Sequence, residues 1–290
     1  MALPVSNLVR LQDNRQLQYY EFGDPLGRPL LYCHGGLSSG LDIMFADTTA
    51  KKAGVRIIAP NRPGVGQSTY VQNRSVLAWA EDVAELVDKL QIKQFAASGW
   101  SAGGQYAMAC GYHMPKRVSR LIIIAGCLEL SQKQQFDQLN AMDKRYTHYS
   151  KKMPYIARMI FRGLWLVAKL SPDYFTKASA KKLAPADSKV LLTESRDNLV
   201  YPTVEALASP KGQVEEYNAF VRPWGFELAQ IPQPVEVWQG GADNLVPPVW
   251  AEQMHRELRR SKLHMFDGLG HFLAHTQIDA ILHAIKATKS

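Results

Sequence analysis

Residues 96–106 read AASGWSAGGQY, a short apolar run and then a serine with a glycine two places before it and another two places after it. Ser101 follows a predicted strand over 94–98 and precedes a stretch compatible with a helix. In that context G-x-S-x-G indicates a nucleophile exposed on a sharp strand-to-helix turn. Gly99 and Gly103 suit such a turn, because a β-carbon at either position would meet nearby backbone. Taken alone, the motif also fits a phosphate-binding turn or a turn without function.

Short apolar runs alternate with helix-like segments along most of the chain. Runs that are apolar throughout suit parallel strands covered on both faces; they span 29–33, 55–59, 94–98, 121–125, 234–239 and 262–266. The run 17–22 alternates, as an exposed hairpin strand would. Helical patterns cover 75–90, with Ser75 as N-cap, and 102–113, 248–260 and 274–286. This order predicts a doubly wound α/β fold, with a mostly parallel central sheet and helices on both faces.

One long stretch breaks the alternation of strands and helices. Between 127 and 231 the chain reads as helices and loops, and the clearest helix spans 153–170. The alternation resumes with the predicted strand that follows. We therefore expect an α/β core made of 1–126 and 232–290, with 127–231 inserted into it as a helical cap.

Length and composition limit the classes of protein to which the chain can belong. The chain has 290 residues, 46% of them hydrophobic, which suits one large domain or one domain carrying an insertion. No apolar run is long enough to span a bilayer, and the N-terminus lacks the charged region and apolar block of a signal peptide. The scattered cysteines Cys33, Cys110 and Cys127 lack metal-ligand spacing and suit buried free thiols in a reducing compartment. We therefore expect a cytoplasmic protein.

Positive charge is concentrated in one part of the chain. The net charge is +8, and residues 144–182 hold ten basic residues against a single acid, Asp173. A solvated basic face explains this pattern most simply. The alternative is attraction to acidic substrates or weak contact with an anionic membrane surface. Nucleic acid is not an expected partner, because no recognition module accompanies the charge.

A serine nucleophile needs a base, and the base needs an acid to orient it. His271 lies in GLGHFLAH just after the last predicted strand, and Asp243 lies in WQGGADNLVPP just after the strand before it. Alone, Asp243 would equally suit a helix-capping aspartate. The order Ser101, Asp243, His271, each past a strand end, is the order that accompanies a G-x-S-x-G turn. His275 follows His271 by four residues, but the nearby sequence offers no third ligand for a metal.

Acyl transfer also needs amide donors aimed at the developing oxyanion. The amide of Ala102, directly after the serine, is one candidate. The loop HGG at 34–36 follows another predicted strand, and we favour the Gly36 amide as the second donor, with Leu37 as the neighbouring candidate. His34 suits a structural role in this loop better than the role of a second base.

These motifs together resemble the α/β-hydrolase superfamily, in its capped, esterase- and aminopeptidase-like branch. The matching pieces occur in family order and cover both ends of the chain: HGG at 34–36, RPGVGQS at 62–68, GWSAGG at 99–104, GGAD at 240–243 and GLGHF at 268–272. Many relatives carry aspartate before the second piece, where this chain has Asn61, and that position is structural in the family. The segment 127–231 stands where the family places its helical cap.

The resemblance implies attack by Ser101 on an ester, thioester or amide carbonyl, with His271 moving the proton and no cofactor or metal. Serine at the turn argues against haloalkane dehalogenases and epoxide hydrolases, which carry aspartate there. We expect a serine hydrolase of carboxylesterase type that acts on a small-molecule substrate, an apolar ester. Three alternatives stay open: a proline-iminopeptidase-like peptidase, a hydrolase of carbon–carbon bonds in a diketone, and a low-turnover ligand-binding receptor.

Substrate contacts are expected from the segment 127–231. Its aromatic residues Trp165, Trp224 and Phe226 are candidates for the cavity wall, although packing suits each of them better. A peptidase would need acids to hold the substrate's amine, and the candidates are Glu194, Asp197, Glu205, Glu215, Glu216 and Glu227. The sequence leaves the natural substrate and the oligomeric state open.

Overall fold

An eight-stranded sheet forms the centre of the structure, a computed structural model that describes residues 4–193 and 197–286. Its strand order is β1-β2-β4-β3-β5-β6-β7-β8. The strands are β1 Asn7–Arg10, β2 Gln16–Gly23, β3 Arg28–Cys33, β4 Val55–Pro60, β5 Phe95–Trp100, β6 Val118–Ile124, β7 Val235–Gly240 and β8 Ser261–Phe266. β2 runs antiparallel to both of its neighbours, whereas β3 to β8 run parallel. The carboxyl ends of six strands therefore meet at one edge, where ligands bind in open α/β sheets.

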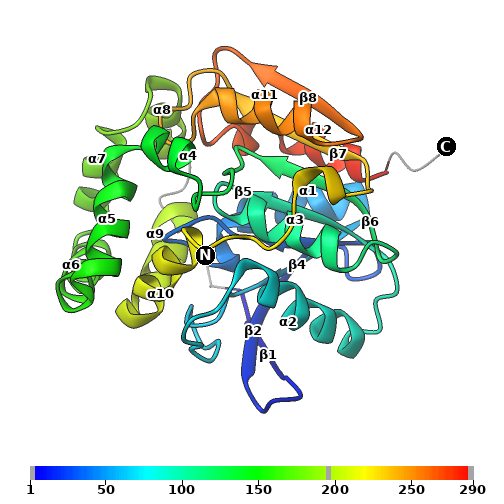
Figure 1. Ribbon diagram of the computed structural model, residues 1–290, viewed down its shortest axis with the longest axis horizontal. Helices are drawn as coiled ribbons and strands as arrows, with labels where there is room; N and C mark the ends of the chain where they lie inside the picture. Colours follow the sequence, from blue (N-terminus) through cyan, green and yellow to red (C-terminus); the bar gives the residue numbers. More distant parts are fainter. Residues whose placement is uncertain (1–3, 194–196, 287–290) are drawn as a thin grey trace.

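Helices cover both faces of this sheet (Figure 1). They are η1 Gly40–Ala46, α1 Asp47–Ala53, α2 Val76–Lys89, α3 Gly103–His113, α11 Pro248–Glu257 and α12 Ala274–Lys286. Side chains of the central strands alternate between two apolar layers. Leu31 and Cys33 pack with α2, α3 and α11, whereas Leu30 and Tyr32 pack with α1 and α12. This period of two buries both faces of the parallel strands, which is why their sequences are apolar throughout.

A helical segment lies between β6 and β7. Within the described residues it contains α4 Lys133–Gln138, α5 Ala141–Lys152, α6 Pro154–Leu170, α7 Pro172–Ala180, α8 Pro185–Thr193, α9 Asp197–Leu207, α10 Pro210–Phe220 and η2 Leu228–Gln230. Proline begins α6, α7 and α10, where its missing amide costs no hydrogen bond. The helices α4 to α10, green to yellow in Figure 1, gather on one side of the molecule.

Every strand and helix predicted from the sequence has a counterpart in the structure, including the Ser75 N-cap, whose hydroxyl accepts from the Ala78 amide at 3.0 Å. The N-terminal hairpin differs from the sequence-based expectation in two ways. It contains the strand β1, which the sequence pattern does not predict. The strand β2 is not exposed: Leu17, Tyr20 and Phe22 are buried, because β2 lies between β1 and β4 and its two faces join the two apolar layers.

The remaining expectations from composition concern cysteines and membrane spans. All three cysteines are buried and free, as predicted. Among the described residues, none of the helices combines the length and the apolar character that crossing a membrane requires.

Candidate active site

Ser101 occupies a strained turn between β5 and α3. Its φ of 56° is left-handed, a conformation that non-glycine residues seldom adopt outside special sites. The turn is held by hydrogen bonds from the Ser101 amide to the Ile124 carbonyl at 2.9 Å and from the Gly104 amide to the Ser101 carbonyl at 3.0 Å. The flanking glycines are sterically required. A β-carbon on Gly99 would lie 2.2 Å from the Gly103 carbonyl oxygen, and one on Gly103 would lie 2.0 Å from the carbonyl oxygen of Cys33.

His271 and Asp243 form a buried pair on the loops after β8 and β7. The Nδ1 atom of His271 lies 2.8 Å from Oδ2 of Asp243. The other carboxylate oxygen accepts the amides of Leu245 and Val246 at 2.8 and 2.9 Å, so the carboxylate is fixed on both sides. Since Nδ1 donates to Asp243, Nε2 is the nitrogen left to exchange a proton with a group bound nearby.

The surroundings of His271 change its affinity for a proton. Burial of the imidazole is the largest single influence and lowers its pKa. The charge of Asp243, its hydrogen bond, and the charges of Asp187 and Asp143 act in the opposite direction and together outweigh burial. The net pKa is therefore raised above the ordinary histidine value, so the imidazolium is stabilised.

The loop after β3 lies next to the serine turn. A β-carbon placed on Gly36 would be 3.7 Å from that of Ala102, so the two backbone segments are neighbours. The described part of the chain offers no hydrogen-bond acceptor to the amides of Gly36 and Ala102, and the same holds for Leu37. Ala102 is buried and Gly36 is half-buried, and both line the cavity, so this pair of amides is suited to receive an anionic oxygen of a bound group.

A buried network of hydrogen bonds and ion pairs fixes the loop after β3. Arg62 donates to the carbonyls of His34 and Gly35 at 2.6 and 2.7 Å. It also pairs with Glu216 of α10, which pairs with Arg74 as well. His34 is fully buried, and burial lowers its pKa well below the ordinary value. It accepts the Arg62 amide on Nε2 at 3.2 Å, which supports the structural role expected for it.

Asp187 of α8 reaches the loop that carries His271. Its carboxylate accepts the backbone amides of His271 and Phe272, both at 2.8 Å, and the residue is 1% exposed. A β-carbon on Gly270 would lie 2.2 Å from the same carboxylate. The contact joins residues 84 positions apart in the chain, so no local pattern in the sequence pointed to it. A carboxylate from the helical segment therefore fixes the backbone of the histidine loop.

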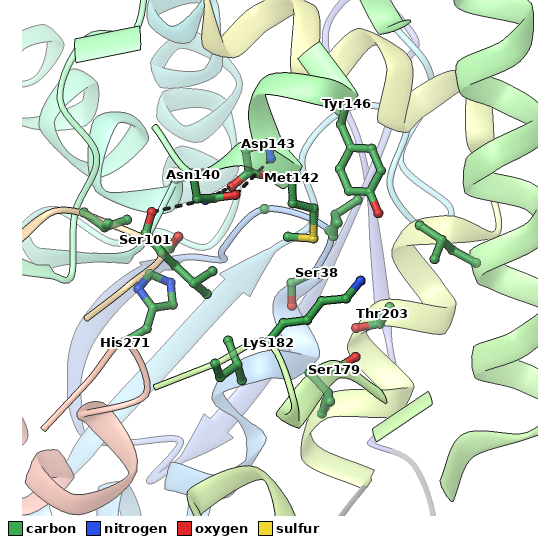
Figure 2. A pocket seen from close by; sticks show the side chains of 18 of the residues that line it. Ser38, Ser101, Asn140, Met142, Asp143, Tyr146, Ser179, Lys182, Thr203 and His271 are labelled. Carbon is green, nitrogen blue, oxygen red and sulfur yellow. Dashed lines mark hydrogen bonds between the residues drawn. The ribbon is translucent and has the colours of Figure 1, made fainter. Parts of the chain in front are cut away.

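A cavity of about 830 Å³ opens beside these groups. Gly36, Ser101, Ala102 and His271 all line it, while Asp243 lies behind the histidine. Figure 2 shows the side chains of Ser101 and His271 together at one end of the cavity, with Lys182 reaching across it. The structure thus brings all five predicted site residues to one place, the carboxyl edge of the sheet.

Helices of the segment 127–231 supply most of the remaining wall. Leu139, Ile160, Leu164, Leu183 and Leu207 line the cavity, so its surface is predominantly apolar.

The aromatic candidates of the segment 127–231 pack in or against the core and do not line the cavity, which agrees with the preference for packing. Trp165, Trp224 and Phe226 are not among the lining residues; Trp224 and Phe226 stack on each other inside the core, and the Trp224 indole donates to Gln105 at 2.8 Å. Trp100, just before the serine, does line the cavity, and its indole donates to the His271 carbonyl at 3.0 Å.

The described residues contain no group of three side chains positioned to hold a metal ion. His275 stacks on Phe45, with ring centroids 3.9 Å apart, and burial lowers its pKa to about 4. Cys127 also borders the cavity, but burial raises the pKa of its thiol far above the ordinary value. The thiol therefore stays protonated at neutral pH, whereas the left-handed turn marks Ser101 as the nucleophile candidate.

Comparison with known proteins agrees with this architecture. A family model described as alpha/beta hydrolase fold matches residues 28–277, which is most of the chain. The chain belongs to the α/β-hydrolase fold family. Within the family, it is 24% identical over 257 residues to a proline iminopeptidase of Lactobacillus helveticus, covering 84% of this chain and 83% of that protein.

One further relative of this α/β hydrolase and one solved structure of the same fold carry esterase names. It is 26% identical over 271 residues to a pimeloyl-[acyl-carrier protein] methyl ester esterase of Aromatoleum aromaticum, covering 89% of this chain and 97% of that protein. The solved esterase EaEST of Exiguobacterium antarcticum superposes with a TM-score of 0.73 at 17% identity, covering 98% of each chain. Family membership supports a hydrolase as the class of enzyme, while the relatives differ in the substrates that their names give.

Proposed function

We propose that this protein is a serine hydrolase that cleaves an apolar carboxylic ester through an acyl-enzyme on Ser101. One observation carries the proposal: the left-handed turn of Ser101 and the His271–Asp243 pair meet at one end of an apolar cavity. A serine, a histidine and a carboxylate in this chain order on strand-end loops are the components of nucleophilic catalysis in such folds.

In the first half of the proposed reaction, Oγ of Ser101 attacks the ester carbonyl carbon while Nε2 of His271 takes the hydroxyl proton. The carbonyl oxygen becomes an oxyanion and accepts the amides of Gly36 and Ala102. The carbon–oxygen bond to the alcohol then breaks, and His271 returns the proton to the departing alcohol oxygen. Asp243 holds the imidazole in the tautomer that makes this transfer possible and stabilises its cation.

In the second half, water replaces the alcohol. His271 takes a proton from the water, whose oxygen attacks the acyl carbon, and the same two amides stabilise the second oxyanion. The bond to Ser101 breaks, its oxygen recovers the proton from His271, and the carboxylic acid leaves. The balance requires only ester and water.

We further propose that 127–231 acts as a cap on a core made of 1–126 and 232–290. The support is that helices of this segment supply most of the cavity wall around the serine, and that its Asp187 fixes the histidine loop. An apolar wall favours an apolar acyl or alkyl group, because each buried methylene contributes about 0.8 kcal/mol.

The positions of the acidic residues favour an ester over a peptide with a free amine. Glu205 accepts from Gln18 and Tyr20, Glu215 pairs with Arg222, and Glu216 is enclosed by two arginines; none of them lines the cavity. Asp197 and Glu227 are also absent from the wall, and Glu194 lies outside the described residues.

Asp143 does line the cavity, but both of its oxygens already have donors. They are the Tyr217 hydroxyl and the Asn140 amide, each at 2.7 Å. The support for a peptidase that holds a substrate ammonium group is therefore weak.

The proposal is tested by comparing p-nitrophenyl butyrate with the p-nitroanilide of proline. We expect kcat/KM to be higher for the ester, and labelling with a fluorophosphonate to add its mass to Ser101. A clear preference for the proline amide would favour the peptidase. Failure of the folded protein to label at Ser101 would favour a binding protein with little turnover.

A further inference from the structure

Exposed apolar side chains are concentrated on one part of the helical segment. Of the thirteen large hydrophobic residues that are exposed in the described structure, eight lie within residues 153–174. The most exposed of these are Tyr155 at 76%, Met159 at 74%, Leu170 at 72% and Tyr174 at 68%. Single exposed hydrophobic residues are normal, but a contiguous group indicates a binding surface.

The helix α6 has two apolar faces. Ala157, Phe161 and Ala168 are buried and anchor it to the rest of the protein. On the opposite side an exposed stripe formed by Tyr155, Met159, Leu166 and Leu170 falls within an arc of about 60°, since successive residues turn by about 100°. We call this the outer stripe. Figure 1 shows α6 at the outer edge of the molecule, away from the sheet.

Basic residues border the outer stripe along one side. Arg162 and Lys169 both lie over the ring of Trp165, 4.1 and 4.6 Å from its centroid, and Arg158 lies 5.3 Å from the ring centroid of Tyr155. Among the described residues none of these three cations has an ion-pair partner. An apolar stripe edged by unpaired cations is the pattern of a helix that lies in a membrane interface.

The outer stripe also adjoins the cavity. Val167 and Tyr174 are exposed, and both belong to the cavity wall, as does Gly163 on the same helix. Residues of α6 and α7 close to the outer stripe therefore also line the space beside Ser101.

We propose that α6 and the start of α7 dock on an anionic lipid membrane. The outer stripe enters the boundary between headgroups and acyl chains, and Arg158, Arg162 and Lys169 contact the lipid phosphates. A second copy of the chain fits less well, because each copy carries a net charge of +8 and pairing would bring two basic borders together.

Sedimentation with lipid vesicles tests this proposal on the full-length protein. Vesicles of phosphatidylcholine alone are compared with vesicles containing an equal part of phosphatidylserine, at low and at high salt. We expect binding to the anionic vesicles at low salt and its loss at high salt, because screening weakens the attraction. Reversing charge with Arg162→Glu and Lys169→Glu should weaken binding by on the order of tenfold or more.

Matched control variants distinguish the contribution of the outer stripe to membrane binding from that of exposed apolar or basic residues elsewhere on the protein. Met159→Ser with Leu170→Ser should weaken binding, whereas Leu26→Ser with Val249→Ser, which alters exposed apolar residues elsewhere, should leave it unchanged. Lys51→Glu with Lys52→Glu changes the net charge equally on α1 and serves as the charge control.

None of the substituted residues lines the cavity, so hydrolysis of a soluble ester should stay the same in every variant. The assay reads sedimentation and not hydrolysis, so its outcome is independent of the proposed function. Absence of binding to anionic vesicles, or equal binding by the stripe variant, would overturn the proposal. If the protein instead formed a dimer that the double variant Met159→Ser, Leu170→Ser lost, the outer stripe would be a contact between two copies of the chain and not a membrane-binding surface.

Discussion

At the scale of single residues, Ser101 is distinguished by its backbone. Its left-handed φ is stabilised by the Ile124 and Gly104 hydrogen bonds and permitted by two flanking glycines that leave no room for a side chain. Strain of this kind persists only where the surroundings enforce it. Trp100 contributes from the other side, since its indole ties the serine turn to the His271 carbonyl.

The pH dependence of hydrolysis should report the raised pKa of His271. The proposed base works only when neutral, so activity is lost as pH falls through the pKa of the imidazole. Because that pKa is raised, the acid limb of kcat/KM for p-nitrophenyl butyrate should lie above the ordinary value of 6.5.

Replacing Asp243 removes the charge that raises this pKa most. Asp243→Asn should move the acid limb to lower pH and reduce kcat by about 10³- to 10⁴-fold, because the tautomer is no longer held. An acid limb that stayed in place in this variant would show that another group controls it.

At the scale of elements, the serine turn and the histidine loop are fixed from different directions. The serine belongs to β5 and α3, whereas the His271 loop is held by α8 through Asp187. The loop after β3 is held by Arg62, which pairs with Glu216 of α10. Two helices of the segment 127–231, α8 and α10, therefore hold loops of the candidate site in place, in addition to the residues that the segment contributes to the cavity wall.

Asp187 is expected to act as a positioning residue. Asp187→Ala leaves two buried amides without an acceptor, at a cost of about 1–3 kcal/mol each, and should lower both the midpoint of urea unfolding and kcat. Asp187→Asn keeps one acceptor oxygen and removes a charge that raises the pKa of His271. It should therefore be the more stable of the two variants.

A pH profile separates positioning from stability alone. In Asp187→Asn the acid limb of kcat/KM should shift to lower pH, with KM little changed. The contrary result is a loss of stability in Asp187→Ala and Asp187→Asn, with kcat and the acid limb of kcat/KM matching those of the unmodified protein. That result would show that Asp187 has a structural role only.

At the scale of the whole molecule, the sheet was predictable because its parallel strands are buried on both faces. That burial leaves short apolar runs that a sequence shows directly. β1 leaves no apolar run in the sequence, because two of its four residues are half-buried and two are exposed. The alternation of β2 does not reveal its pairing with β4, which buries it.

The site was predictable to the extent that each residue follows a strand end in a recognisable motif. Ser101, Asp243 and His271 converge because parallel strands share a carboxyl edge. Asp187 and the Arg62–Glu216 pair were not predictable, since they depend on contacts between segments distant in the chain. The residues that line the cavity depend on how the helices pack against one another. The periodicity of a sequence predicts each helix but not this packing.

The cavity predicts a preference among substrates. Its apolar wall and its volume of about 830 Å³ leave room for more than an acetyl group. For p-nitrophenyl esters from acetate to hexanoate, kcat/KM should rise by up to about fourfold per methylene, since each contributes about 0.8 kcal/mol when buried. A series that peaked at acetate would indicate that the acyl group does not occupy this cavity.

The central claim is that Ser101 is the nucleophile of an ester hydrolase. Its most direct test is kcat/KM for p-nitrophenyl butyrate in Ser101→Ala, compared with the unmodified protein at the same concentration and with matching circular dichroism spectra. Loss of the hydroxyl removes the acyl-enzyme, and we predict a fall of at least about a thousandfold. Full activity in the Ser101→Ala variant would contradict the account.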